Sequence, residues 1–110
     1  MWQEDNDKIL KILDCLYDKK KLFPVNCPIC SKKDGHIYLY RHNINSHSGG
    51  LWLWCSTCHH SSHSRYSLPI WWNNLNTLDT SKLSSFPDYL EENKNDIDKW
   101  VNKIKLSLLK

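Results

Sequence analysis

The stretch Cys27-Pro28-Ile29-Cys30, followed twenty-four residues later by Cys55-Ser56-Thr57-Cys58, decides the fold of this chain. Two residues between cysteines allow a tight turn, or knuckle, that aims both sulfurs at one point. Two knuckles then complete a tetrahedron of thiolates around a metal ion. The spacing therefore predicts one structural zinc ion, and its expected ligands are Cys27, Cys30, Cys55 and Cys58.

The sequence between the knuckles has the two-residue period of β-strands. Residues 36–42 and 51–54 alternate branched and aromatic side chains, which strands favour. Residues 43–50 contain Asn, Ser and two Gly, which is typical of a turn. This pattern predicts a β-hairpin with a long tip. Antiparallel pairing of its strands would bring the two knuckles together.

Amphipathic helices are expected on both sides of the hairpin. Residues 6–21 repeat apolar side chains at the spacing of one helical face, and Pro24 prevents continuation. Pro87 suits the start of a C-terminal helix, and whether Leu90 belongs to that helix is left open. The expected apolar face of this helix is Ile97, Trp100, Val101, Ile104 and Leu108.

The predicted fold class is therefore α+β, a zinc ribbon with four cysteine ligands flanked by an N-terminal and a C-terminal helix. One domain is expected over residues 1–110. Its parts are an N-terminal helix (1–24), the zinc ribbon (25–66), and a Trp-containing connection with the C-terminal helix (67–110). The connection is expected to be irregular over residues 73–85.

Composition and cysteine usage favour a globular cytoplasmic protein. The chain has 110 residues, of which 40% are hydrophobic and 25% charged. Its first residues are acidic, and no apolar run suggests a signal peptide or a membrane span. Because the cytoplasm keeps thiols reduced, paired cysteines are read as metal ligands before disulfides.

The cysteines admit other interpretations. A redox Cys-x-x-Cys motif precedes a helix in a βαβ unit, and that pattern is missing from the sequence. His59, His60 or His36 could replace one cysteine ligand, and spacing alone leaves this alternative open. Cys15 lies beside the apolar face of the N-terminal helix and is expected to be a small core residue. Four thiolates would close the coordination shell, so we expect a non-enzymatic protein.

The charge distribution does not by itself indicate a nucleic-acid-binding protein. The net charge is +3, and the excess lies in residues 27–66, while both flanks are neutral. Four thiolates and one Zn²⁺ would lower the net charge to +1. The sequence pI of 8.6 is below the value of about 9 expected of a nucleic-acid-binding domain.

Aromatic side chains supply two candidate contact surfaces. One hairpin face would carry Tyr38, Tyr40, Trp52 and Trp54, which could stack on nucleic-acid bases. We favour burial of this face, because the helices must cover apolar surface. Trp71 and Trp72 are adjacent and cannot both face one core, so they are the candidate partner-binding residues.

The histidines His59, His60 and His63 are candidates for a second metal site or a catalytic base. No carboxylate lies near them in the sequence, so a solvated loop after the second knuckle is expected. The sequence also suggests no Ser-His-Asp arrangement, phosphate-binding loop or paired carboxylates.

Residues 25–58 resemble the zinc-ribbon class, through the two knuckles and the hairpin between them. The run Gly49 to Cys55, then Cys58, Ser61-x-His63 and Pro69-x-Trp71-Trp72, is similar to small bacterial zinc-ribbon proteins associated with toxin loci. That resemblance implies an immunity or antitoxin protein, which neutralises a toxin by binding it.

The leading functional hypothesis is therefore a protein-binding module with a cognate toxin as partner. The alternative is a nucleic-acid-binding zinc ribbon that acts in transcription or replication. A weaker third hypothesis is a toxin or nuclease that uses the histidines.

Overall fold

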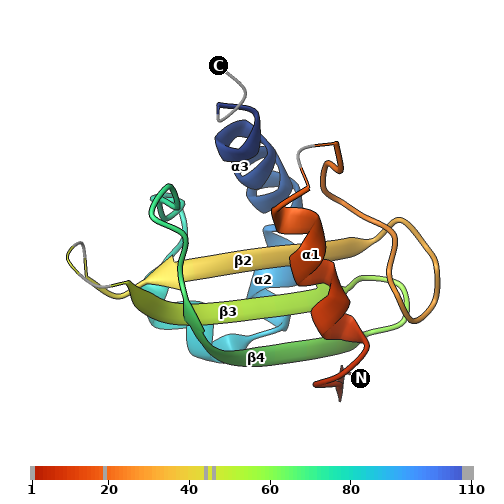
Figure 1. Cartoon of the computed structure of the whole chain (residues 1–110). Helices are drawn as coiled ribbons and strands as arrows, with labels where there is room; N and C mark the ends of the chain where they lie inside the picture. Colours follow the sequence, from red (N-terminus) through yellow and green to blue (C-terminus); the bar gives the residue numbers. More distant parts are fainter. Residues whose placement is uncertain (1, 19, 44, 46, 108–110) are drawn as a thin grey trace.

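The computed structural model describes residues 2–18, 20–43, 45 and 47–107. Strands and helices share the chain (Figure 1), in the order β1 (Gln3–Glu4), η1 (Ile9–Lys11), α1 (Ile12–Leu16), β2 (Gly35–Arg41), β3 (Ser48–Cys55), β4 (His60–Ser67), η2 (Thr80–Ser85), α2 (Asp88–Glu92) and α3 (Lys94–Ser107). The α+β class predicted from the sequence is thus present.

The strands form one sheet in the order β1-β4-β3-β2. β2 and β3 pair antiparallel, with Ile37 opposite Leu53, so the expected pairing of these two segments occurs. β4 pairs antiparallel with β3, and β1 pairs parallel with the first residues of β4. The prediction of a solvated loop after the second knuckle is therefore wrong, because His60–Ser67 is a strand. The serines and histidines of this segment do not alternate with apolar residues, so the sequence shows no sign of a strand. The backbone hydrogen bonds with β3 stabilise the strand instead.

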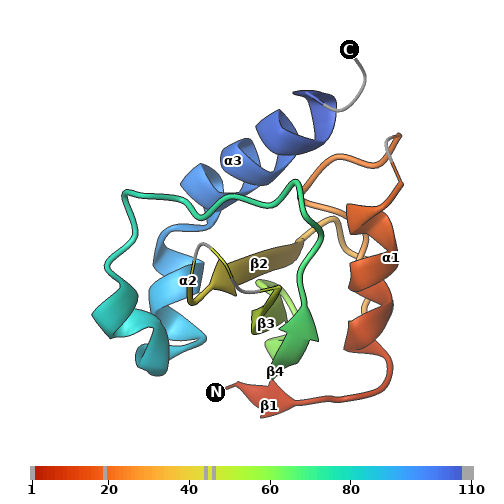
Figure 2. The ribbon, with the colours of Figure 1, turned by 60° about the vertical axis from the view of Figure 1, so that its left-hand side comes forward.

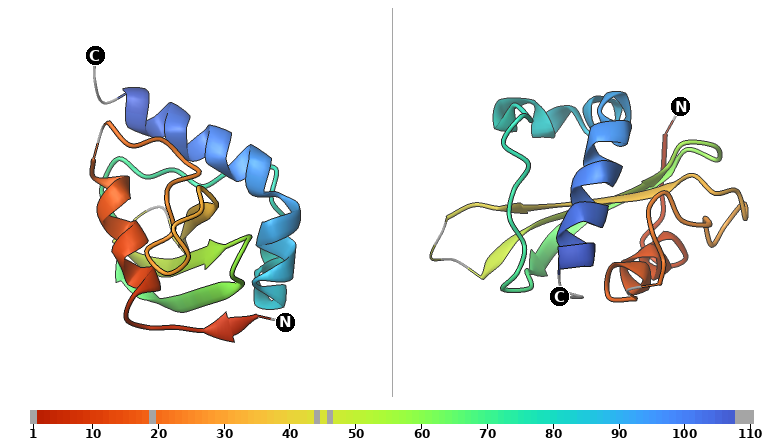
Figure 3. Two further views of the ribbon diagram at one scale, coloured as in Figure 1. Left: turned by 90° about the vertical axis from the view of Figure 1, so that its right-hand side faces the viewer. Right: turned by 90° about the horizontal axis from the view of Figure 1, so that it is seen from above.

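Helices cover the sheet from both sides. Viewed from above, α1 lies on one side, while η2 and α2 lie on the other (Figure 3). α3 packs beside β2, which is an edge strand, and so covers that edge (Figures 1 and 2).

Both faces of the central strands are buried. The aliphatic face consists of Ile37, Leu39, Leu51 and Leu53, none of them more than 2% exposed. On the other face Tyr38, Trp52 and Trp54 are also buried. Three of the four predicted aromatic residues of this face are therefore core, with Trp72 in edge-to-face contact with Tyr38, whereas Tyr40 is half-buried.

The N-terminal helix is shorter than the predicted span of residues 6–21. The Asp5 carboxylate accepts a hydrogen bond from the backbone N–H of Ile9 at 3.0 Å, so the helical region begins there. α1 ends at Leu16, and buried Lys105 donates through Nζ to the carbonyl of Cys15 at 2.6 Å. A lysine of α3 therefore satisfies a carbonyl at the end of this helix.

The C-terminal helical region is divided in two. Asn93 separates α2 from α3, and Leu90 lies buried in α2. The α3 residues Ile97, Val101 and Ile104 are buried, as the spacing predicted, whereas Leu108 lies outside the described residues. The connection expected to be irregular contains η2, which Asp79 caps by accepting from the N–H of Ser81. None of the described helices is both long and apolar enough to cross a membrane.

Candidate metal centre

Four cysteine sulfurs meet at one end of the sheet. The Sγ atoms of Cys27, Cys30, Cys55 and Cys58 all lie within 4.8 Å of one another. Cys27 Sγ is 3.7 Å from Cys58 Sγ, and Cys30 Sγ is 3.6 Å from Cys55 Sγ. These separations are too long for disulfide bonds, whose sulfurs lie about 2 Å apart. The four residues are thus placed to hold a metal ion, as the spacing predicted.

The two knuckles have the same backbone form. After the second cysteine of each pair, Ser31 and His59 have positive φ values of 68° and 59°. Each donates its N–H to the carbonyl of the first cysteine, Ser31 to Cys27 at 2.9 Å and His59 to Cys55 at 3.1 Å. This repeated turn directs both sulfurs of each pair to one side, where the two pairs face one another.

The surroundings of the thiols disfavour four thiolates without a compensating cation. Burial raises the pKa of the Cys55 and Cys58 thiols above the usual range. Burial also acts to raise the pKa of Cys30, but hydrogen bonds from the Lys32 N–H and the neighbouring cysteines hold it below the usual value. Thiolates are the form that binds metals, and four of them this close together repel one another. A cation among them removes that repulsion.

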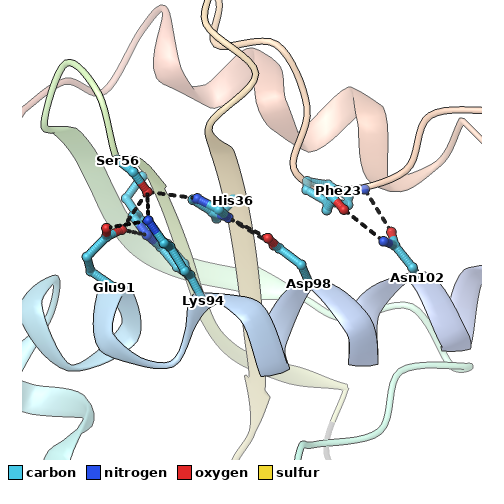
Figure 4. Close-up of polar contacts among 8 residues, drawn as sticks. Phe23, His36, Ser56, Glu91, Lys94, Asp98 and Asn102 are labelled. Atoms are coloured by element: carbon cyan, nitrogen blue, oxygen red, sulfur yellow. Dashed lines mark hydrogen bonds and ion pairs between the residues drawn. The ribbon is translucent and has the colours of Figure 1, made fainter.

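A row of polar side chains on α3, the polar stripe, contacts the segment before the first knuckle and the network that includes Ser56 of the second knuckle (Figure 4). The stripe consists of Lys94, Asp98 and Asn102, which are spaced four residues apart and so lie on one face of the helix. Asn102 pairs with the backbone of Phe23, ahead of the first knuckle. Asp98 accepts from His36 Nδ1 at 2.9 Å, and His36 Nε2 lies 2.9 Å from Ser56 Oγ in the second knuckle.

The Ser56, His36 and Asp98 side chains therefore form a Ser-His-Asp arrangement, which no pattern in the sequence predicts. Ser56 has one hydroxyl proton, which it donates to Glu91 Oε1 at 2.6 Å. Ser56 therefore has no hydroxyl proton left for His36 Nε2, and the Nδ1 atom of the same ring faces the Asp98 carboxylate. A catalytic triad instead needs an unprotonated Nε2 that accepts the serine proton. The two arrangements differ in the position of this proton.

The network around Ser56 gives each of its carboxylates a nitrogen partner. The His36 imidazole lies against the Asp98 carboxylate, and the Lys94 ammonium faces Glu91, with Lys94 Nζ 3.1 Å from Glu91 Oε2. Burial raises the pKa of Asp98, and the hydrogen bond from His36 opposes that effect. Buried charges are tolerated when they are paired in this way. The network thus fixes the second knuckle on α2 and α3.

The remaining candidate ligands lie outside the sulfur cluster. His36 is engaged with Asp98, so it does not replace a cysteine. Among the described residues the metal-binding group contains only the four cysteines, and neither His59 nor His60 belongs to it. The ring of His63 stacks on Trp52 with centroids 4.6 Å apart, rather than joining the other histidines. Cys15 packs against the hydrophobic core, as expected.

The structure separates the two tryptophans proposed as partner-binding residues. Trp72 is 1% exposed and contacts Tyr38, so it is a core residue and not the partner-binding residue that the sequence predicted. Trp71 is half-buried and lies in edge-to-face contact with Tyr17, at a centroid distance of 6.4 Å. Of the pair, Trp71 alone keeps surface available to a partner.

Comparison with protein-family models, with curated proteins and with solved structures found no significant match.

Proposed function

We propose that the four cysteines bind one structural Zn²⁺ and that the chain is a zinc ribbon. A tetrahedral zinc ion with Zn–S bonds of about 2.3 Å has its sulfur ligands about 3.8 Å apart. The separations of 3.6 and 3.7 Å are close to this value. Four cysteine thiolates are a donor set that suits zinc. Bound zinc would contribute folding free energy, which is about 10–16 kcal/mol in small zinc-dependent peptides.

We further propose that the folded chain is a protein-binding module, which neutralises a toxin partner by occlusion. A cluster of surface aromatic residues carries this proposal. The aromatic cluster consists of Tyr17, Tyr66 and Trp71. The Tyr17 and Tyr66 hydroxyls are 2.6 Å apart, and Trp71 lies edge-on to Tyr17. Tyr17 is 51% exposed, and Ile70, beside Trp71 in the chain, is 84% exposed. Exposed aromatic and aliphatic side chains of this kind are typical of protein interfaces.

The burial of three of the four aromatic residues on the hairpin face weakens the nucleic-acid alternative. That alternative needs exposed rings on which bases can stack. Tyr38, Trp52 and Trp54 are at most 4% exposed, so they offer no such platform. The net charge of +1 expected with zinc bound gives little electrostatic attraction to phosphates. Both features favour a protein partner.

The toxin-neutralising form of the proposal draws on the motif that runs from Gly49 to Trp72. In the structure this motif supplies β3, the second knuckle, β4 and the segment that crosses the sheet. Neutralisation by occlusion needs no reaction at the metal, and four sulfur ligands leave zinc no open coordination position. The histidines are therefore not required for the activity.

The direct test is purification of the tagged, zinc-loaded chain from its native host, with cross-linking and mass spectrometry of the partner. The purified partner is then titrated with the chain. Inhibition should reach a one-to-one endpoint and should survive alanine substitution of His59, His60 and His63. Generic nucleic acid should bind no better than roughly 10⁻⁴–10⁻⁶ M at physiological salt. Submicromolar, steeply salt-dependent binding would overturn the proposal.

A further inference from the structure

The outer edge of β4 is only partly paired. β1 covers its start, where Gln3 N–H donates to the His59 carbonyl at 2.7 Å and Asp5 N–H donates to the Ser61 carbonyl at 2.8 Å. Backbone groups alternate in direction along a strand, so those of residues 63, 65 and 67 point to the same outer side. In Figure 1, β4 lies on the side of the sheet away from β2, and the two-residue strand β1 is its outer neighbour at its start alone.

The rest of this outer edge is open. Within the described residues, no hydrogen bond reaches the outward N–H or carbonyl groups of His63, Arg65 or Ser67. The pairing of β4 with β3 is regular from Ser61 to Ser67, so no bulge turns the edge away. Proteins normally protect a free edge with proline, a bulge or a covering segment. In the part of the chain that the structure describes, residues 63–67 have none of these three devices, and the charge of Arg65 is the protection that this edge carries.

The side chains beside the open edge differ on the two faces of the sheet. Arg65 is exposed, and its side chain makes no hydrogen bond or ion pair within the described part of the chain. Its neighbour on the same face, His63, lies flat on Trp52. On the opposite face, Tyr66 belongs to the aromatic cluster. The edge thus combines open backbone groups with an exposed cation on one face and an aromatic surface on the other.

We propose that the edge of β4 over residues 63–67 binds an extended segment of a protein partner, which adds to the sheet as a further strand. The partner strand would place a carboxylate beside Arg65 and an apolar side chain beside the aromatic cluster. Backbone hydrogen bonds supply affinity in this mode, and the alternate side chains supply specificity. The inference rests on the proposed function and identifies the surface that it uses.

Charge argues against a second copy of the chain as the occupant. Antiparallel pairing of two β4 edges centred on Arg65 would set two guanidinium groups opposite one another. Like charges in that position destabilise a strand pair. A partner with an acidic side chain at the same position gains a favourable cross-strand pair instead.

The test uses zinc-loaded protein and linear peptides selected on it from a random phage-displayed library. The selected peptides should be rich in Asp or Glu. Arg65→Ala removes the charge and keeps the outward N–H, so peptide affinity should fall about threefold. Arg65→Pro also removes the N–H, which makes no bond within the described residues, and should cost roughly a further tenfold. Lys99→Glu, on the exposed face of α3, is the control and should leave affinity unchanged.

Hydrogen exchange supplies a second readout should Arg65→Pro lose zinc or unfold. The amides of His63, Arg65 and Ser67 should exchange rapidly in the free protein and become protected when a selected peptide binds. Equal peptide affinity in wild type and Arg65→Pro, unprotected edge amides in the complex, or failure to select any peptide would overturn the inference. Peptides bound elsewhere would overturn it too, while leaving the proposed protein-binding function standing. A wild-type dimer that Arg65→Pro dissociates would assign the edge to a second copy.

Discussion

Asn102 and Phe23 form a closed pair of hydrogen bonds, although they lie 79 residues apart in the sequence. The Asn102 amide accepts from the Phe23 N–H and donates to the Phe23 carbonyl, both at 2.8 Å. The Asn102 side chain thereby satisfies the backbone groups of Phe23, ahead of Cys27, in the way that a neighbouring strand would. Together with the contact between Asp98 and His36, it makes α3 the support of both knuckles.

Replacing Asn102 by Ala should destabilise the zinc-loaded protein by about 2 kcal/mol, because two backbone groups of Phe23 lose their partner. Urea unfolding in the presence of excess zinc measures this change. Asn95→Ala, an exposed substitution on the same helix, is the matched control and should change stability by less than about 0.5 kcal/mol. Equal stability of the two variants would show that the Asn102 contact does not support the fold.

Ser56→Ala should weaken zinc binding by about 10-fold or more, because Ser56 holds the second knuckle against His36 and Glu91. Competition with a chromogenic chelator measures the affinity, and Ser64→Ala, at an exposed position of β4, is the control. Unchanged affinity in Ser56→Ala would contradict this role. Labelling of Ser56 by a fluorophosphonate ester would contradict the assignment of its proton to Glu91.

Ser31→Gly should preserve zinc binding and raise stability by up to about 1 kcal/mol, because glycine adopts a positive φ without steric cost. Ser31→Val should lower stability, since a β-branched residue is strained at a φ of 68°. Thermal unfolding of the zinc-loaded variants distinguishes the two effects. If both substitutions shift the midpoint equally, the backbone at Ser31 differs from the conformation described.

Tyr38 should make stability fall at alkaline pH. Burial raises its pKa to about 12, from an ordinary value of about 10. Between these values the unfolded chain loses the phenol proton and the folded chain keeps it, so folding weakens as pH rises. Relative to Tyr38→Phe, the wild type should lose roughly 1 kcal/mol between pH 8 and about pH 11. Parallel stability–pH curves from urea unfolding would refute this.

The sequence predicted the parts of the fold that depend on local spacing. The two Cys-x-x-Cys pairs placed the four sulfurs, and alternation identified the segments that became β2 and β3. Helical periodicity likewise placed Ile97, Val101 and Ile104 on the buried face of α3. Each of these features can be predicted from neighbouring residues, because a knuckle, a strand and a helical face are each defined by the spacing of residues within a short segment.

Features that depend on distant residues were not predictable in this way. β4 is a strand because β3 lies beside it, since its own serines and histidines show no apolar alternation. The only carboxylate close to His36 in the middle segment of the sequence is Asp34. The carboxylate that His36 contacts is that of Asp98, which lies 62 residues away in the sequence. Adjacent Trp71 and Trp72 gave no indication of which ring enters the core. The path of residues 68–72 across the sheet decides that question.

The measurement that tests the central claim most directly is metal content, determined by elemental analysis of purified wild-type and variant chains. The account predicts about one zinc per chain in the wild type and in Cys15→Ser, since one tetrahedral site takes one ion. Cys27→Ser and Cys58→Ser should lose zinc and unfold, because metal binding and folding are coupled. Loss of zinc in Cys15→Ser, or a stably folded wild-type chain without metal, would contradict the account.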